Sequence, residues 1–288
     1  MLSNKRHFAY NLLSSYGNTI FSVIFSLISV PIALNYWGTE LYGVWTIITS
    51  FVTYINATGL GIDSATGCLM TKNNGLIVKI NILKKGVKLL ILCSIVAACI
   101  LFLLTYFFPN WFKIIGKMDE KNYPIVKIST LIFFVGVIIN LPFSAISNSL
   151  ASFGKAYIGS LMGIFQTVLQ FIIIVLTASF SLSVPFYIGL ISFNTLFFNI
   201  IKLFIVILTV NKRKLTNNIE DEDLSEDNNY KSILKMGINM SLYGIVILLV
   251  PNFSNLIISN NIDVEALVPY SFSYKLFAFS AVIEYTVC

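Results

Sequence analysis

Few side chains in this sequence could carry out covalent chemistry. His7 is its one histidine, and its four cysteines show no C-x-x-C spacing. The sequence holds no phosphate-binding G-x-x-x-x-G-K-[ST] loop, and no residues spaced as a metal site or a catalytic triad. We therefore expect a protein that is not an enzyme and that uses no metal and no cofactor.

The residues that could bind a solute are polar side chains embedded in long apolar segments. Lys202 and Lys275 lie within such segments, and an ionisable group at membrane depth is costly unless it has a partner or serves a pathway. Amides and hydroxyls recur every three or four residues, which places them on one face of a helix. The candidate substrate-binding residues are Lys202, Lys275, Asn18, Asn140, Gln166, Gln170 and Asn199.

Such polar stripes have two interpretations. Serine, threonine and asparagine hold membrane helices together, and Gly159 with Gly163 forms a G-x-x-x-G motif suited to close helix packing. For a single residue, packing is the better interpretation. The same pattern on at least five segments favours a shared hydrophilic cavity, which is typical of a transporter.

The elements that carry these residues must be membrane-spanning helices. The chain has 288 residues, of which 57% are hydrophobic and only 11% charged, and its mean hydropathy is +0.83. Apolar stretches of about twenty residues match the length of a helix that crosses a bilayer. We predict an all-α, polytopic transmembrane helix bundle with about eight spans: 12–34, 41–62, 87–108, 124–148, 157–179, 185–210, 236–258 and 268–288.

Charge patterning suggests the domain organisation and the orientation. Residues 1–210 are expected to form a first bundle of six helices, 211–235 a charged cytoplasmic linker (NKRK followed by EDEDLSEDNN), and 236–288 the first two helices of an incomplete second bundle. Most lysines and arginines fall in segments that share one side, so the N terminus is predicted to be cytoplasmic. The net charge of +6 then needs no nucleic-acid partner, and the loops can contact anionic lipids.

The stretch YWGTELYGVWTI, residues 36–47, is predicted to be the short external hairpin between the first two spans. Gly38 and Gly43 would allow a tight turn. Its aromatic residues are expected to lie at the level of the lipid headgroups, where a ring keeps its apolar body in lipid and its polar edge in water. They are Tyr36, Trp37, Tyr42 and Trp45.

One long stretch carries a family resemblance. ISVPIALNYWGTELYGVWTIITSFVTYINATGLGIDSATG, with a proline before a G-x-E-x-Y-G hairpin and a Gly-Leu-Gly that ends the second span, resembles bacterial O-antigen and capsule polysaccharide flippases of the multidrug, oligosaccharidyl-lipid and polysaccharide exporter superfamily. The resemblance implies two six-helix bundles in the bacterial cytoplasmic (inner) membrane. These would flip an undecaprenyl-pyrophosphate-linked oligosaccharide by alternating access, among membrane lipids and other glycan-assembly membrane proteins.

The resemblance also sets expectations for individual residues. Lys202 and Lys275 would contact the pyrophosphate or its sugars, and the asparagine and glutamine side chains would line the path. Family members often carry an aspartate just before the glycine that ends the second span. Here Thr58 stands there and the acid follows as Asp63, so no ion-coupling role is assigned to Asp63. Because the second bundle is incomplete, the chain is expected to be a truncated form of a longer protein.

Three alternatives stay open. A cation-coupled multidrug extruder of the same superfamily would share this architecture, although the basic cavity argues against it. A polytopic glycan polymerase or ligase would have a similar composition, but the longest predicted external loop, about 109–123, offers only the adjacent acids Asp119 and Glu120. The chain could also be a non-functional remnant.

Overall fold

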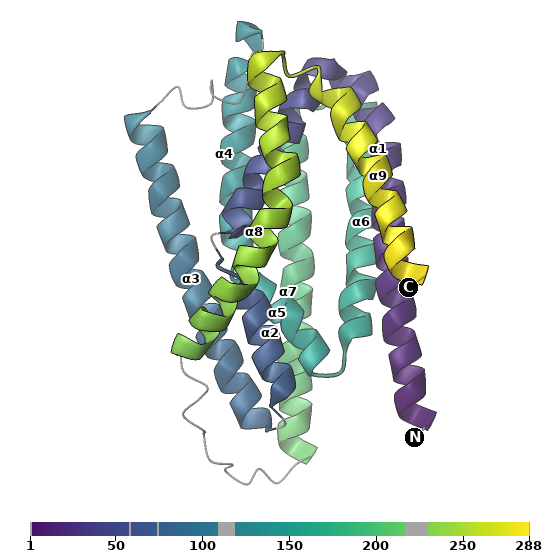
Figure 1. The fold of residues 1–288 in the computed structure, drawn as a ribbon, viewed down its shortest axis with the longest axis vertical. Coiled ribbons are helices and arrows are strands. Elements are labelled where there is room, and N and C mark those ends of the chain that lie inside the picture. The colour runs from purple at the N-terminus through teal and green to yellow at the C-terminus, as the bar shows by residue number, and fades with distance from the viewer. Residues whose placement is uncertain (1, 58, 74, 109–118, 217–229, 288) are drawn as a thin grey trace.

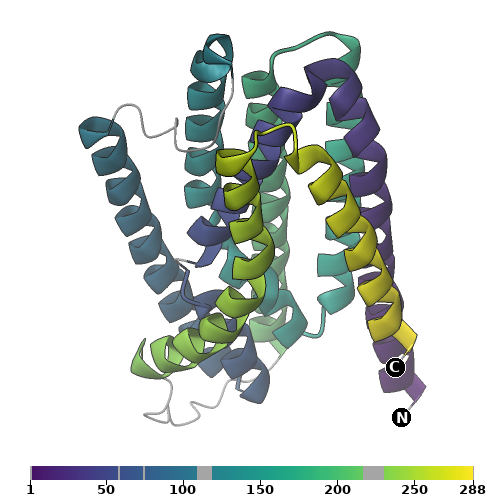
Figure 2. The same ribbon diagram turned by 45° about the horizontal axis from the view of Figure 1, so that its top comes forward.

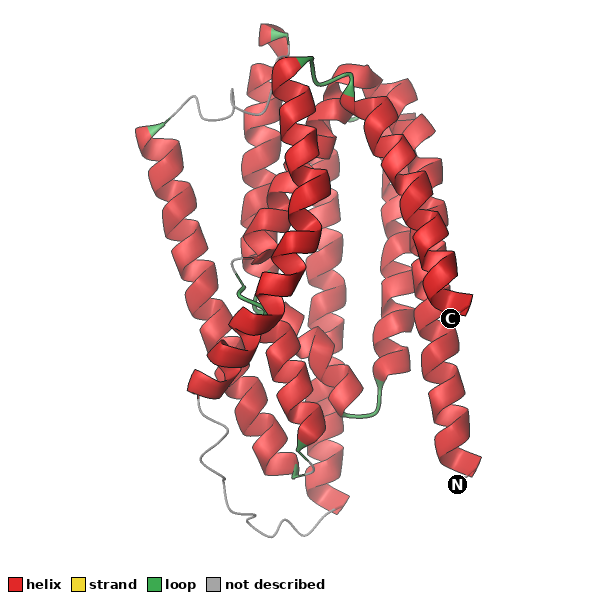
Figure 3. Cartoon of the chain, viewed as in Figure 1, coloured by secondary structure: helices red, strands yellow, loops and turns green. Residues whose placement is uncertain are grey.

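The computed structural model is an all-α bundle, as predicted (Figures 1 and 3). It describes residues 2–57, 59–73, 75–108, 119–216 and 230–287. Within these ranges every α-helix and 3₁₀ turn is as follows: α1 Leu2–Ala57, α2 Ile62–Lys72, α3 Leu76–Phe107, η2 Glu120–Asn122, α4 Tyr123–Asn140, α5 Phe143–Ser152, α6 Ala156–Ser179, α7 Val184–Thr216, α8 Tyr230–Asn261 and α9 Leu267–Val287.

The chain is a multi-pass membrane protein. Among the described residues, five helical stretches are long and apolar enough to cross a bilayer: Leu13–Phe51, Leu76–Phe107, Glu120–Asn140, Ala156–Ser179 and Val184–Arg213. The predicted spans 236–258 and 268–288 lie on α8 and α9, where the side chains of 243–251 and of 278–288 are outside the described part. The predicted total of eight spans therefore stays a prediction.

The first two predicted spans are the two limbs of α1. Its backbone stays helical from Leu2 to Ala57 except at Gly38, where φ is 78° and ψ is 173°. A residue with a Cβ rarely adopts a positive φ, so the glycine is what allows this bend. The chain turns back at the top of Figure 1, and we call this end of the bundle the hairpin end. The predicted hairpin is thus a sharp bend at a single non-helical residue, Gly38, rather than a loop.

The aromatic residues of this hairpin mostly face protein, which the predicted headgroup belt did not anticipate, while their depth in the membrane stays a prediction. Tyr42 is only 3% exposed. The rings of Trp37 and Trp45 lie with their centroids 4.7 and 5.8 Å from that of Tyr187 on α7. Only Tyr36, at 46%, is well exposed. Helix α7 packs against the hairpin and covers these rings, which a single-helix pattern does not show.

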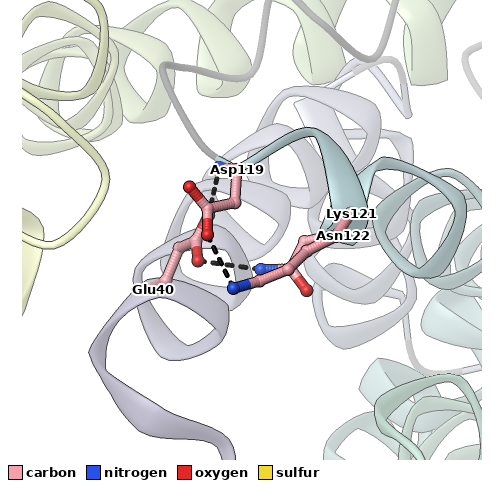
Figure 4. Close-up of polar contacts among 4 residues, drawn as sticks. All are labelled: Glu40, Asp119, Lys121 and Asn122. Atoms are coloured by element: carbon pink, nitrogen blue, oxygen red, sulfur yellow. Dashed lines mark hydrogen bonds and ion pairs between the residues drawn. The ribbon is translucent and has the colours of Figure 1, made fainter.

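Glu40 ties the hairpin to the segment that precedes α4 (Figure 4). One carboxylate oxygen accepts the backbone N–H of Asp119, and the other accepts the side-chain amide of Asn122 at 2.8 Å. Lys121 forms an ion pair of 2.7 Å with Asp119, and both of these side chains are more than half exposed. The ion pair therefore stabilises little, whereas the two hydrogen bonds to Glu40 join segments about 80 residues apart in sequence.

Two helix breaks lie within the bundle, one at the end of the second predicted span and one inside the fourth. Span 41–62 is interrupted after Ala57, where Leu60 and Gly61 have φ of 50° and 60°, and the chain restarts as α2. Span 124–148 is interrupted at Leu141 and Pro142, between α4 and α5. Proline has no N–H to continue the helical ladder, so α5 begins after it. The continuous span 124–148 was thus wrong, because it is a pair of helices, whereas span 41–62 is one helix that ends at Ala57 rather than at residue 62.

Three basic side chains donate hydrogen bonds at the turn between α5 and α6. Lys79 on α3 donates to the carbonyl of Ser152 at 3.0 Å, and Arg213 on α7 donates to the carbonyl of Phe153 at 2.8 Å. Lys155 donates to Thr209 at 2.8 Å. The last carbonyls of a helix attract cations, so this turn binds α3 and α7 to α5. We call this end of the bundle, opposite the hairpin end, the basic end.

The predicted linker, 211–235, is shorter than expected. Helix α7 continues to Thr216 and α8 begins at Tyr230, so only 217–229 lies between the helices, and those residues are outside the described part. Helix α8 then packs across α1 and α2, and α9 runs along the first limb of α1 (Figures 1 and 2). The division into 1–210 and 236–288 as separate bundles stays a prediction.

Glycines allow this close approach of α8 and α9 to the preceding helices. A Cβ on Gly43 would lie 2.0 Å from the carbonyl oxygen of Val264. A Cβ on Gly61 would lie 2.5 Å from the carbonyl oxygen of Gly237. Between these contacts the buried amide of Asn255 donates to Ser50 at 2.8 Å. Backbone proximity and one buried hydrogen bond therefore fix α8 in place.

Candidate functional site

Two polar cavities lie side by side between helices α1 to α7. The first, of about 420 Å³, is lined by α1, α2, α5, α6 and α7 and contains Lys202. The second, of about 560 Å³, lies beside the two helix breaks, between α1 and α2 and between α4 and α5, and is lined by Gly59 and Leu141 among others. We call them the lysine cavity and the break cavity. Both volumes fall within the range of small-molecule binding sites.

The lysine cavity combines one cation with hydroxyl and amide groups. Its polar lining is Asn18, Ser64, Thr71, Ser147, Asn148, Ser160 and Lys202. The half-buried ammonium of Lys202 has no hydrogen bond or ion pair with another described residue. An unpaired cation beside several hydroxyl groups is suited to bind an anion, because the charge lacks compensation and the hydroxyls can donate.

Asn18 enters this cavity because Gly163 on α6 makes room for it. A Cβ on Gly163 would lie 2.6 Å from the Oδ1 atom and 2.9 Å from the Nδ2 atom of Asn18. That Oδ1 atom is buried and has no hydrogen-bond partner among the described residues. The G-x-x-x-G motif therefore does admit a close neighbour at Gly163, whereas Gly159 has only an ordinary contact with Leu150.

The break cavity is lined by a different set of polar groups, and its one charged side chain is acidic. They are Asp63, Asn140, Ser144, Gln170, Ser192 and Thr195. The amide of Gln170 forms no hydrogen bond with a described residue, and the buried hydroxyl oxygen of Ser192 has no partner there either. Asp63 uses one carboxylate oxygen in a contact described below. The cavity thus offers a carboxylate, an amide and a hydroxyl to a solute.

A single hydrogen bond joins the walls of the two cavities. The Nδ2 atom of Asn148, which lines the lysine cavity, donates at 3.2 Å to the Oδ2 atom of Asp63, which lines the break cavity. Helices α2 and α5 carry these residues and touch closely, since a Cβ on Gly67 would lie 3.4 Å from that of Asn148. The wall between the cavities is therefore the contact of two short helices.

Three of the predicted binding residues take part in bonds between helices. The amide of Asn199 on α7, 8% exposed, donates to the Oδ1 atom of Asn140 on α4 at 2.8 Å. Gln166 on α6 donates to Thr195 on α7 at 3.3 Å. Asn140 also lines the break cavity, so it both joins helices and faces the cavity, while Gln166 and Asn199 line neither cavity. For these two the observed contacts are those of helix packing.

Lys275 and Lys202 are not brought together. Lys275 on α9 donates to the hydroxyl of Tyr42 at 3.2 Å, and its ammonium lies 5.8 Å from the centroid of that ring. It lines neither cavity. Of the seven predicted residues, Lys202 and Asn18 thus line the lysine cavity and Asn140 and Gln170 line the break cavity. A contact of Lys275 with substrate stays a prediction.

Sequence reasoning did not single out several residues that line these cavities. Ser64 and Thr71 lie on α2, between the predicted spans 41–62 and 87–108, and Ser147 lies on α5, within the predicted span 124–148. No role was assigned to Asp63 from the sequence, yet it lies in the first turn of α2, at the break, and lines a cavity. The signals were present: Gly59, Leu60 and Gly61 mark one break, and Pro142 marks the other.

Comparisons with models of known families, with characterised proteins and with solved structures found no match to this chain. The chemistry of the site therefore rests on its own geometry. That geometry provides a place for an anion beside Lys202 and a separate place for a neutral or cationic group beside Asp63.

Proposed function

We propose that this protein moves a lipid-linked oligosaccharide, carried on undecaprenyl pyrophosphate, across a bacterial cytoplasmic membrane. The observation that supports this most directly is the unpaired ammonium of Lys202 in a hydroxyl-lined cavity inside a bundle of apolar helices. A pyrophosphate cannot enter hydrocarbon cheaply, because a charged group loses most of its solvation there. A membrane protein that moves it must supply compensating charge and hydrogen-bond donors.

The lysine cavity supplies both kinds of group. Lys202 provides the positive charge, and the hydroxyls of Ser64 and Ser147 and the amide of Asn18 provide neutral donors. The adjacent break cavity has the complementary character for the sugars, since Gln170 and Asp63 can pair with hydroxyl groups that both donate and accept. Broken helices beside a cavity are typical of transporters, in which they carry the substrate site.

Gene replacement in the host tests this proposal. Deletion of the gene should reduce surface glycan and leave lipid-linked glycan on the cytoplasmic leaflet, where an impermeant lectin added to inside-out vesicles detects it. The Lys202→Gln variant should reproduce the defect. Lys121→Gln, which alters a side chain 75% exposed near the hairpin end, is the matched control and should export normally.

The outcomes separate transport from the role of the lysine. If deletion changes neither pool of glycan, the transport proposal fails. If deletion traps the lipid-linked glycan but Lys202→Gln exports normally, transport stands and the assignment of Lys202 fails. Membrane insertion of each variant, measured by immunoblot of the membrane fraction, excludes simple loss of the protein.

One observation favours a second candidate, a cation-coupled extruder. Asp63 is a carboxylate in the break cavity, and only its Oδ2 atom has a hydrogen bond to a described residue. A cationic drug could bind there. Expression of the chain in a host without drug pumps should then confer resistance to ethidium that Asp63→Asn abolishes. Unchanged sensitivity to ethidium would remove this candidate.

A further inference from the structure

Helices α3 and α8 carry four exposed lysines at the basic end of the bundle. Lys84 and Lys88 lie one turn apart on α3, and Lys231 and Lys235 lie one turn apart on α8. None of the four has a hydrogen bond or ion pair with another described residue. Four uncompensated cations on two helices produce a strong local positive potential.

The two helices are neighbours where these lysines lie. The ammonium of Lys85 on α3 lies 5.6 Å from the ring centroid of Tyr230, the first residue of α8. Ile82 on α3 and Ile233 on α8 are both fully buried in one apolar cluster. The first turns of α8 lie beside the lower half of α3 in both views (Figures 1 and 2). The two lysine pairs therefore belong to one surface.

Each lysine pair continues into a line of exposed apolar residues. On α3 the positions that follow Lys84 and Lys88 at intervals of four residues are Leu92, Val96 and Ile100. These side chains are 57%, 50% and 51% exposed. Residues four apart lie above one another on a helix. The same face thus changes from charged to apolar along the direction in which the helix enters the membrane.

Helix α8 repeats this order. After Lys231 and Lys235 come Ile238 and Leu242, which are 43% and 59% exposed. A ligand that binds along both helices must have an anionic group for the lysines. It must also have an apolar part, about two helical turns long or more, for the exposed apolar residues that follow them. A free phosphate or an acidic peptide matches only the lysines. A phospholipid with an anionic headgroup matches the whole surface.

We propose that the surface formed by Lys84, Lys88, Lys231 and Lys235, with the apolar lines of α3 and α8, is a binding site for an anionic phospholipid. The headgroup phosphate contacts the four ammonium groups, and the acyl chains lie along Leu92, Val96 and Leu242. None of these residues lines either cavity, and the site does not depend on the transport proposal.

Native mass spectrometry of the full chain tests this site. The protein is released from nanodiscs that contain equal amounts of phosphatidylglycerol and phosphatidylcholine with identical acyl chains, and the retained lipids are counted. We expect retained phosphatidylglycerol to predominate. The pairs K84Q/K88Q and K231Q/K235Q should each lower that preference by roughly fivefold to thirtyfold, since each basic residue near the surface contributes up to about fivefold.

Two further variants keep the test specific. K72Q/K121Q removes the same charge from exposed lysines outside the surface and should leave the preference unchanged within about twofold. K84R/K88R retains the charge and should retain the preference. Circular dichroism of all variants establishes that they are folded.

Several results would overturn the proposal. If K72Q/K121Q lowers the preference as much as the test pairs do, net charge rather than this surface attracts the lipid. If neither test pair lowers it, the site is not there. If millimolar inorganic phosphate displaces the retained lipid from the wild-type chain, the surface binds free phosphate rather than a phospholipid.

Discussion

The lysine cavity and the break cavity share a wall but differ in charge. One holds an ammonium with no partner among the described residues, and the other holds a carboxylate that uses only one of its oxygens there. The helices α2 and α5 that separate them are the short segments that follow the two helix breaks. The comparison shows that helix breaks inside a membrane bundle can place opposite charges close together without an ion pair between them.

The largest expected effect separates the cavities by ligand charge. With undecaprenyl pyrophosphate as the probe and the full chain in nanodiscs, Lys202→Gln should lower affinity about 10- to 100-fold. This range corresponds to the loss of one charge-assisted hydrogen bond of roughly 1.5–3 kcal/mol. Gln170→Leu, in the break cavity, should change the affinity by less than about threefold, because no charge is removed. Scintillation proximity with radiolabelled probe measures both.

An equal loss in both variants would break the distinction between the cavities. It would mean that the pyrophosphate spans the wall between α2 and α5. A loss confined to Gln170→Leu would instead assign the anion to the break cavity, against the charge of Asp63.

A second prediction concerns packing beside each cavity. A Cβ at position 136 would lie 2.7 Å from the Cβ and 2.5 Å from the Oγ of Ser192, so Gly136→Ala should destabilise the bundle by about 1–3 kcal/mol. Gly159→Ala meets only Leu150 at 3.7 Å, and should be neutral or stabilising by up to about 1 kcal/mol. Unfolding in mixed micelles with increasing sodium dodecyl sulfate measures the difference.

A compensating variant sharpens this test. Ser192→Gly removes both atoms that the new methyl group would meet, so it should restore much of the stability of Gly136→Ala. If it restores none, the close approach of α4 and α7 at this point is not the cause.

The smallest expected effect concerns the hydrogen bonds around the break cavity. Asn199→Ala removes the donor to Asn140 and should cost about 0.6–1 kcal/mol, the range measured for polar contacts between membrane helices. Its effect on probe affinity should stay below about twofold, since Asn199 lines neither cavity. A larger loss of affinity than of stability would show that Asn199 reaches the substrate.

The sequence was sufficient to predict the class of fold and most helix positions, because runs of apolar residues as long as a bilayer have few alternatives. It failed at Pro142, where hydropathy stayed high across a residue that cannot continue a helix. Hydropathy averages over a window and does not resolve one missing hydrogen bond. The Gly-Leu-Gly at residues 59–61 did mark the end of the second span, but the helix that follows it, α2, was not predicted.

The site could be predicted only in part. Helical periodicity identifies the polar face of α6, and so selected both Gln166 and Gln170. It does not say which of them meets Thr195 and which faces the cavity, since that depends on the neighbouring helix. Likewise, Lys202 and Lys275 looked equivalent in sequence. Tyr42, 233 residues away, distinguishes them by accepting a hydrogen bond from Lys275 alone.

The hydrogen bond between Asn255 and Ser50 has a consequence for the time course of synthesis. Its partners are 205 residues apart, an interval that a ribosome covers in roughly 10–40 s at about 5–20 residues per second. During that delay the hydroxyl of Ser50 still has a hydrogen-bond partner, because it donates to the carbonyl of Thr46 within α1. The hydroxyl of Ser50 therefore keeps a hydrogen bond within α1 until α8 is synthesised. The side-chain amide of Asn255, which is synthesised later, then donates to the hydroxyl oxygen of Ser50, whose position within α1 is already set.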